Sequence, residues 1–291
     1  MTVPKAPQQF SPTRPTEQPI PGPRSGGRVV VGADCSYWGQ IALRWAAEHA
    51  WMAGAALEVH KPPVALGLAD DDRFGRILRG FPMLRVAVRT GADAAAELVS
   101  ASRSADLVVL GCRGDDHRGI GVGSAVPPVV AGAACDVMVV GGRPAAVRGT
   151  NHRISVLLGT DDNQYALASA ARFAMLRRVP LRILLATPLV GPHPLRAPLD
   201  EHLATLENAE AIAHRIEPAV RTTSQVMWSS PHELVGRIDD TDILVLGPPQ
   251  GLDSVTRIAL HQAASPVLVA HRAQRSRRQL GLRPATSSSL R

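Results

Sequence analysis

The amino-acid sequence predicts an α/β fold made of two tandem five-stranded parallel-sheet sandwiches. Strand-like apolar runs alternate with helical segments, and the whole series of segments occurs twice along the chain. Hydrophobic residues make up 45% of the chain but aromatic residues only 3%, so the core has to consist of Val, Leu, Ile and Ala. This composition is typical of parallel sheets that helices cover on both faces.

The internal repeat is weak at each residue but keeps its order. Three strand-like segments of the first half recur in the second: "RVVVGAD" (28–34) as "SVLLGTD" (155–161), "ADLVVLG" (105–111) as "TDILVLG" (241–247), and "CDVMVV" (135–140) as "SPVLVA" (265–270). We interpret this order as a tandem duplication.

The first expected strand, 28–34, precedes a helix whose start Ser36 can cap and whose end Gly54 can form. Trp45 and Trp51 are expected to be packing residues, and His49 a core residue. Four residues of this helix share one face at helical spacing: Ile41, Trp45, His49 and Met52.

The rest of the first half continues the alternation of strands and helices. Strands are expected at 56–59, 84–88, 106–111 and 136–140, and a helix over 92–104. Because helical crossovers make the strands parallel, ligands are expected beyond their carboxyl ends. Asp34 and the loop after the fourth strand both lie at that edge.

That loop contains a cluster of glycines. Glycine allows a close backbone approach or a tight turn, so the cluster is either a phosphate cradle or a connector. The glycines are Gly111, Gly114, Gly119, Gly121 and Gly123.

The ends of the chain and its middle differ in composition from the two repeats. Residues 1–27 are rich in Pro, Gln, Ser and Thr, 273–291 are basic, and both are expected to be disordered. Residues 143–152 are expected to be a linker between a first domain at 28–142 and a second at 153–272.

The net charge of +7 lies mainly in the two ends of the chain, so the part between them is nearly neutral and a nucleic-acid partner is not expected. No signal peptide and no membrane span are found, and the three cysteines are far apart in sequence. We therefore expect a reduced, cytoplasmic protein with no membrane partner.

Several enzyme and cofactor signatures are missing. "GIGVGS" does not follow a first strand as a dinucleotide fingerprint does, no Walker A lysine occurs, and no residues have metal-ligand spacing. Ser36 has no base placed to activate it. The sequence predicts no catalytic residue, although slow ATP hydrolysis stays open.

The first half resembles the universal stress protein family. The resemblance rests on Gly-x-Asp after the first strand, on "DLVVLG", and on Gly111-x2-Gly114 followed by Gly123-Ser124. It implies the adenine nucleotide α-hydrolase-like fold, and an ATP site, with Mg²⁺ able to accompany the ATP. The cofactor-binding residues that it implies are Ala33, Asp34, Lys61, Leu110, Gly111, Arg113, Gly114, Gly123, Ser124, Ala125 and Val126.

Three departures from the family pattern weaken the ATP prediction. Eight residues separate Gly114 from Gly123 where the family has nine, Cys35 replaces a glycine, and Pro127-Pro128 stand near the start of the next expected helix. The leading interpretation is an ATP-binding regulatory stress-response protein. The alternative is a nucleotide-free scaffold or dimerisation protein.

The second half departs further from the ATP-binding pattern. Alignment of the repeats places Asp253-Ser254 under Gly123-Ser124, and a carboxylate there would repel phosphate. This half is expected to be a degenerate, built-in partner. The resemblance implies association through the last strands, either in a homodimer or within one chain.

Cys35 and Cys112 follow two strands that should be neighbours. One hypothesis is that their thiols lie at the mouth of the same site, where oxidation would block a nucleotide. The other is that both are small, semi-buried residues.

Overall fold

The computed structural model describes residues 27–63, 68–114, 121–159, 163–187, 199–248 and 252–272. The expected tails at 1–27 and 273–291 lie almost wholly outside them. The strands are β1 (Arg28–Gly32), β2 (Ala56–Lys61), β3 (Val86–Thr90), β4 (Leu107–Gly111), β5 (Asp136–Val140), β6 (Ile154–Leu158), β7 (Leu181–Ala186), β8 (Thr222–Met227), β9 (Ile243–Leu246) and β10 (Val267–Val269).

The helices connect these strands as the alternation of the sequence predicts. They are α1 (Tyr37–Ala53), α2 (Leu68–Arg79), α3 (Ala94–Ser102), α4 (Val126–Gly132), α5 (Pro144–Val147), α6 (Gln164–Arg177), α7 (Leu199–Ile216), α8 (Pro231–Arg237) and α9 (Ser254–Gln262). The third strand begins two residues later than expected, and α2 was not anticipated.

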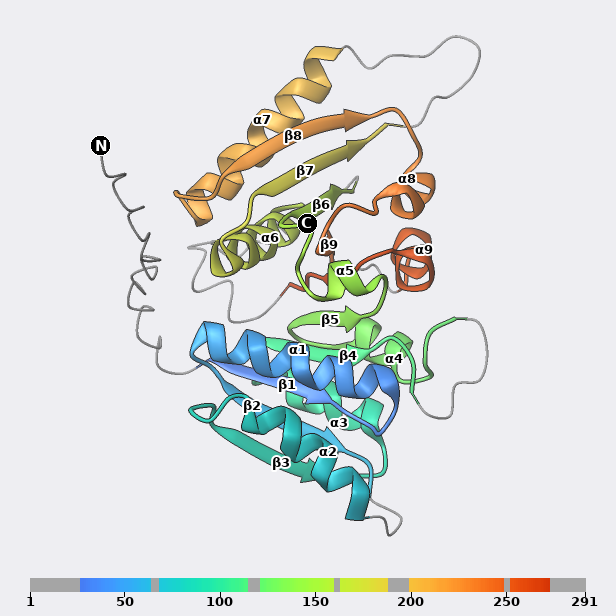
Figure 1. Ribbon diagram of the computed structural model, residues 1–291. Helices are drawn as coiled ribbons and strands as arrows, with labels where there is room; N and C mark the ends of the chain where they lie inside the picture. Colours follow the sequence, from blue (N-terminus) through green and yellow to red (C-terminus); the bar gives the residue numbers. More distant parts are fainter. Residues whose placement is uncertain are drawn as a thin grey trace, which may run out of the picture.

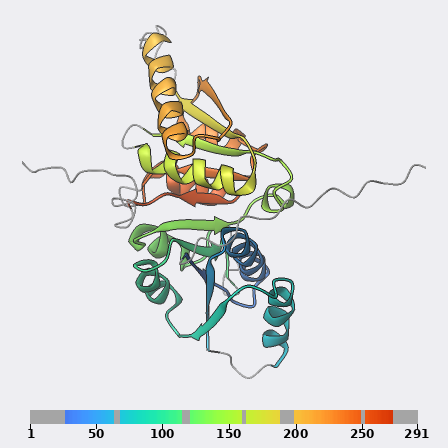
Figure 2. The same ribbon diagram turned by 90° about the vertical axis from the view of Figure 1, so that its left-hand side faces the viewer.

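All the described strands join one ten-stranded sheet, in the order β3-β2-β1-β4-β5-β10-β9-β6-β7-β8. Every neighbouring pair is parallel except β5 and β10, which are antiparallel and place Met138 opposite Leu268. The α/β class with mostly parallel strands is confirmed, but the two halves form one continuous sheet and not two separate ones. Figures 1 and 2 show the first half below the second, joined at β5.

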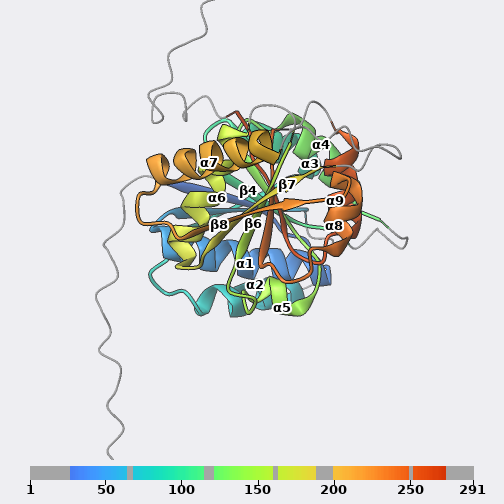
Figure 3. The ribbon, with the colours of Figure 1, turned by 90° about the horizontal axis from the view of Figure 1, so that it is seen from above.

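Helices cover both faces of the sheet, as the near-continuous apolar strands require. Helices α1, α2, α6 and α7 pack on one core, and α3, α4, α8 and α9 pack on the other. The strands cross the middle of the molecule while the helices surround them (Figure 3). Helices α1 and α6 meet where the ring of Phe173 stacks on two rings of α1. The ring centroids lie 4.7 Å apart for His49 and 6.4 Å apart for Trp45.

The local signals at α1 act as the sequence predicts. The Ser36 hydroxyl accepts a hydrogen bond from Gly39 N, and Gly54 ends the helix with a φ of 63°. Trp45 and His49 are buried, as expected. Trp51 was also expected to pack, but this residue is 45% exposed.

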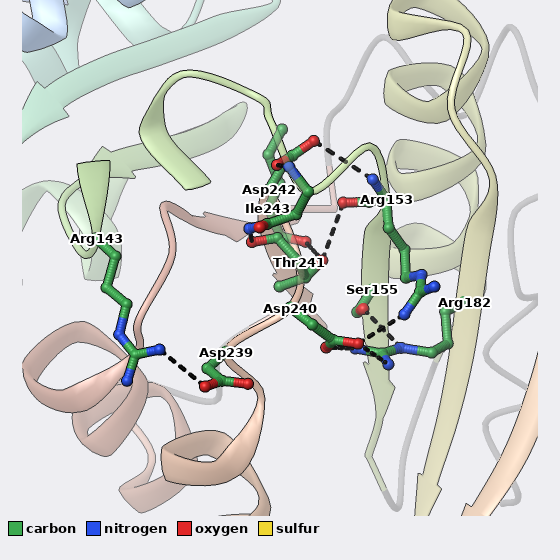
Figure 4. Close-up of polar contacts among 10 residues, drawn as sticks. Arg143, Arg153, Ser155, Arg182, Asp239, Asp240, Thr241, Asp242 and Ile243 are labelled. Carbon is green, nitrogen blue, oxygen red and sulfur yellow. Dashed lines mark hydrogen bonds and ion pairs between the residues drawn. The ribbon is translucent and has the colours of Figure 1, made fainter. Parts of the chain in front are cut away.

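The segment expected to be a linker, 143–152, contains the short helix α5 and is tied to the second half. Arg143 pairs with Asp239 at 2.8 Å, and Asn151 N donates to Asp242 Oδ1 at 2.8 Å. Asp240 accepts hydrogen bonds from Arg153, just before β6, and from Arg182 on β7 (Figure 4). Through these contacts the segment 143–152 is packed against the second half and is not a free linker.

Candidate functional site

A cavity of about 840 Å³ opens at the carboxyl ends of β1 and β4, in the first half of the chain. The start of α3 and the described parts of the glycine-rich loop complete its wall. Lys61, at the end of β2, does not line it, although the preceding His60 does. Ten of the eleven residues that the resemblance implies do line it: Ala33, Asp34, Leu110, Gly111, Arg113, Gly114, Gly123, Ser124, Ala125 and Val126.

Asp34 lies where β1 passes into α1 and faces the glycine loop. Its carboxylate accepts hydrogen bonds from the backbone N–H and the hydroxyl of Ser36. The same hydroxyl lies 3.3 Å from the carbonyl oxygen of Arg113. Ser36 therefore both caps α1 and connects Asp34 to the loop.

The loop glycines lie in close contacts within the chain itself, of which the one at Gly111 is the tightest against backbone. A Cβ on Gly111 would lie 2.7 Å from the carbonyl of Trp38, and one on Gly114 would lie 2.7 Å from Asp34 Oδ2. A Cβ on Gly123 would lie 3.2 Å from Gly114 N. The two ends of the loop are therefore packed against each other and against α1. Gly119 lies outside the described residues.

Arg113 turns along the loop, where its Nε donates to the carbonyl oxygen of Gly121 at 2.7 Å. Its positive charge is opposed at the cavity by Asp34 and by Asp93, the N-cap residue of α3. The described wall is therefore mixed in charge and not strongly basic.

The residues after the loop form a short helix, α4, without a side-chain cap. Ser124 is exposed in the turn before it. Pro127 and Pro128 lie in the first turn, where a missing N–H costs no intrahelical hydrogen bond. The two prolines, expected to be awkward for a helix, are therefore compatible with this one.

His60 and its partners form a polar network that sequence reasoning missed. Its Nε2 lies 2.8 Å from Glu58 Oε1 and its Nδ1 lies 3.3 Å from Glu97 Oε2 on α3. Arg89 Nε donates to the same Glu58 oxygen at 2.8 Å. A period-two pattern in 56–61 could have placed Glu58 and His60 on one face, but α3 and β3 bring the other partners from far along the chain.

The buried carboxylate of this network stays charged. Burial by itself would raise the pKa of Glu58, but the hydrogen bonds from His60 and Arg89 and the charge of Arg28 hold this pKa below its ordinary value. The network therefore fixes the imidazole of His60 at the floor of the cavity.

The two cysteines of the oxidation hypothesis line different cavities. Cys35 lines the cavity described above, whereas Cys112 lines a smaller one and contacts Gly141. Burial raises the pKa of the Cys112 thiol to about 11, against the opposing charge of Arg113. Few thiolates form at neutral pH at such a pKa, so this geometry favours the interpretation as a semi-buried packing residue.

The matching edge of the second half is built differently. Asp253 is the N-cap residue of α9, and its Oδ1 accepts a hydrogen bond from Thr256 N at 2.6 Å. Its carboxylate therefore occupies a backbone N–H donor at the helix N-terminus that a phosphate could otherwise use. Asp161, the counterpart of Asp34, lies outside the described residues.

Within the described ranges, no cluster of three or more His, Cys, Asp or Glu side chains is arranged to hold a metal ion. None of the helices in the described part of the chain is both long and apolar enough to cross a membrane.

Comparison with known proteins supports the fold. No family model and no curated protein sequence matches the chain. A universal stress protein structure from Archaeoglobus fulgidus is similar with a TM-score of 0.60 and 14% identity, over 85% of this chain and 97% of that one. A putative universal stress protein structure from Pseudomonas aeruginosa is similar with a TM-score of 0.56 and 15% identity, over 84% and 92%.

The same fold also occurs in another setting. The cytoplasmic domain of a prokaryotic cation chloride cotransporter is similar with a TM-score of 0.58 and 12% identity, over 84% of this chain and 95% of that one. The chain thus has the fold found in universal stress protein structures, as the resemblance implied. The function has to be argued from the site.

Proposed function

We propose that the protein is a universal stress protein-like regulator whose first half binds an adenine nucleotide, with ATP as the leading ligand. The observation that carries the proposal is that ten residues implied by the resemblance, widely separated in sequence, line one cavity. Its volume of about 840 Å³ lies in the range of sites for ligands of nucleotide size.

The residues around the cavity fit different parts of a nucleotide. The backbone around Gly114 and from Gly123 to Val126 would hold the phosphates, because no Cβ covers the two glycines. The His60 imidazole and the alanines at the start of α3 offer a less charged wall for the base. Asp34 and Asp93 would repel a bare triphosphate, so a Mg²⁺ ion that neutralises part of its charge fits this wall better.

The second half would act as a silent, built-in partner of the first. Asp253 stands where the first half has Gly123, and its carboxylate already caps α9. The antiparallel pairing of β5 with β10 supports an association between the halves of one chain. We propose no nucleotide in the second half and no catalytic role for either half.

A second candidate function is a nucleotide-free scaffold. The observation that favours it is that contacts with Trp38, Asp34 and the loop backbone explain Gly111, Gly114 and Gly123 without any ligand. In that case the cavity would be left over from a nucleotide-binding ancestor.

Titration with MgATP by calorimetry separates the two candidates. Ala94 lines the cavity at the start of α3, whereas Ala96 is exposed on the same helix turn but does not line it. A glutamate at either position is favourable near a helix N-terminus, so both variants should fold. We expect one site per chain in the natural protein, at least about tenfold weaker binding in Ala94→Glu, and unchanged binding in Ala96→Glu.

Gly123→Asp reproduces the second half's residue in the first half and should also lose the site. Because its Cβ would lie close to Gly114 N, its thermal unfolding is measured alongside. Absence of binding heat in the natural protein would refute the nucleotide proposal and leave the scaffold. Equal weakening by Ala94→Glu and Ala96→Glu would place the nucleotide somewhere else.

A further inference from the structure

A second, smaller cavity of about 230 Å³ lies where the two halves of the chain meet. Trp38, Cys112 and Arg113 line it from the first half, and His261, Ser265 and Val267 line it from the second. It is separate from the larger cavity, although Arg113 lines both. Neither the resemblance nor the proposed function assigns it a role.

Ser265 is one of the residues that line this cavity, and its hydroxyl is a buried polar group. Its side chain is 2% exposed, and its Oγ has no hydrogen-bond partner among the described residues. The repeat aligns Ser265 with Cys135, whose Sγ lies 3.6 Å from the carbonyl oxygen of Asp136. A buried hydroxyl without a partner is costly to folding, so a ligand that accepts a hydrogen bond from it would be stabilising.

The charge around the cavity indicates the sign of such a ligand. Arg113 and His261 line it, and no carboxylate is found among its described lining residues. Arg113 and Cys112 both line the cavity, and the charge of Arg113 opposes the rise in the pKa of the Cys112 thiol that burial causes. A basic wall with a hydroxyl donor favours an oxyanion.

The volume limits the size of the ligand. At about 230 Å³ the cavity is smaller than the sites that take drug-sized molecules, and much smaller than the neighbouring one of about 840 Å³. A single phosphate or a small carboxylate fits such a space.

We propose that this junction cavity binds a small oxyanion, held by the Arg113 guanidinium and the Ser265 hydroxyl, with His261 at the rim. An oxyanion there would contact both halves of the chain at once. Because Arg113 also lines the larger cavity, the oxyanion would alter the electrostatics of that cavity. The proposal does not require a nucleotide to bind.

The cysteines provide a separate reporter for each cavity. Cys112 lines the junction cavity, Cys35 lines the larger one, and Cys135 is 2% exposed, so it should react little in the folded protein. Cys35→Ser leaves Cys112 as the accessible thiol, and Cys112→Ser leaves Cys35. The rate of reaction with a neutral aromatic disulfide is measured at pH 9 and constant ionic strength.

Inorganic phosphate is the first probe, and acetate tests whether a carboxylate suffices. We expect phosphate to slow the labelling of Cys112 in a saturable way and to leave that of Cys35 unchanged. Ser265→Ala in the Cys35→Ser background should weaken this protection by about tenfold, the effect of one lost hydrogen bond to a charged group. Protection by acetate as well would assign the cavity to oxyanions in general, and protection by phosphate alone would assign it to phosphate.

An unchanged Cys112 rate with both probes would overturn the proposal, and so would equal slowing of Cys112 and Cys35. MgATP added to the same two variants keeps the proposals apart. Protection of Cys35 by MgATP supports the nucleotide proposal alone, whatever phosphate does to Cys112.

Discussion

The carboxyl edges of the two halves begin from the same strand pattern but use their glycines differently. In the first half, a Cβ on Gly111 would lie 2.7 Å from the Trp38 backbone. In the second half, no atom of the described residues lies within 4 Å of such a Cβ on the corresponding Gly247. The duplicated strand end therefore has a glycine in both places, but within the described part of the chain only the glycine of the first half is in close contact with a helix.

The loops that follow these strands also differ in how closely their residues are packed and in whether a cavity lies beside them. In the first half the loop ends meet through Gly114 and Gly123, and a large cavity remains beside them. In the second half Asp253 caps α9 directly. A shared sequence motif is thus a weak indicator of a shared site, and the close contacts of each glycine are more informative.

The largest expected effect comes from adding a methyl group to each strand-end glycine. Gly111→Ala forces a Cβ against backbone that cannot move freely, and we expect a loss of about 3 kcal/mol in the free energy of unfolding. Gly247→Ala meets no atom of the described residues and should be neutral or stabilising by about 0.5 kcal/mol, because it reduces the freedom of the unfolded chain. Urea unfolding of both variants measures this. Equal losses would contradict the comparison.

The pH dependence of the free energy of unfolding tests whether His49 is buried where the two halves meet, against Phe173 of the second half. Burial, helped by the charge of Arg177, lowers the pKa of His49 to about 3. The unfolded chain therefore takes up a proton below about pH 6.5 that the folded one does not, so stability is lost as the pH falls. Between pH 7 and pH 5 this loss is about 2 kcal/mol, and His49→Phe should remove it.

Asp136 acts in the opposite direction over part of this range. Burial raises its pKa to about 6 against the hydrogen bonds from Ser169 and from His271 N, so protonation of the folded state adds stability between about pH 6 and pH 4. Comparison of His49→Phe with the natural protein at each pH cancels this contribution. Parallel pH profiles for the two proteins would show that His49 titrates normally.

The smallest expected effect on stability comes from substitutions at the turns before α9 and α4, because only α9 has a side-chain cap there. Asp253→Ala removes the N-cap of α9 and should cost about 1 kcal/mol. Ser124→Ala, at the aligned turn before α4, should cost close to nothing, because Ser124 is exposed and α4 has no side-chain cap. Thermal unfolding at equal protein concentration checks both. A larger cost for Ser124→Ala would show a contact of its hydroxyl that the structure lacks.

The sequence predicted what depends on local chemistry. Ser36 and Gly54 bound α1 because capping and the left-handed conformation are decided within a few residues. The gathering of Asp34 with Gly111 and Gly123 followed from a general rule, that parallel strands present their carboxyl ends at one edge. These parts of the site needed no knowledge of packing.

What depends on distant contacts could not be predicted. The floor of the cavity rests on His60 between Glu58 and Glu97, and Arg89 joins them from β3. That the hydroxyl of Ser265 is buried without a hydrogen-bond partner in the described part of the chain can be seen only once β10 lies beside β5. Periodicity along the chain does not encode which strands become neighbours across the sheet.

The antiparallel pair of β5 and β10 has a consequence for association. Because both strands belong to one chain, their local concentration does not depend on how much protein is present, and a tether of this kind corresponds to an effective concentration in the millimolar range. A second copy would have to displace β10 from β5 against that advantage. In the described sheet β3 and β8 are the outer strands, so strand pairing between whole molecules that left the β5–β10 pair intact would have to use one of them.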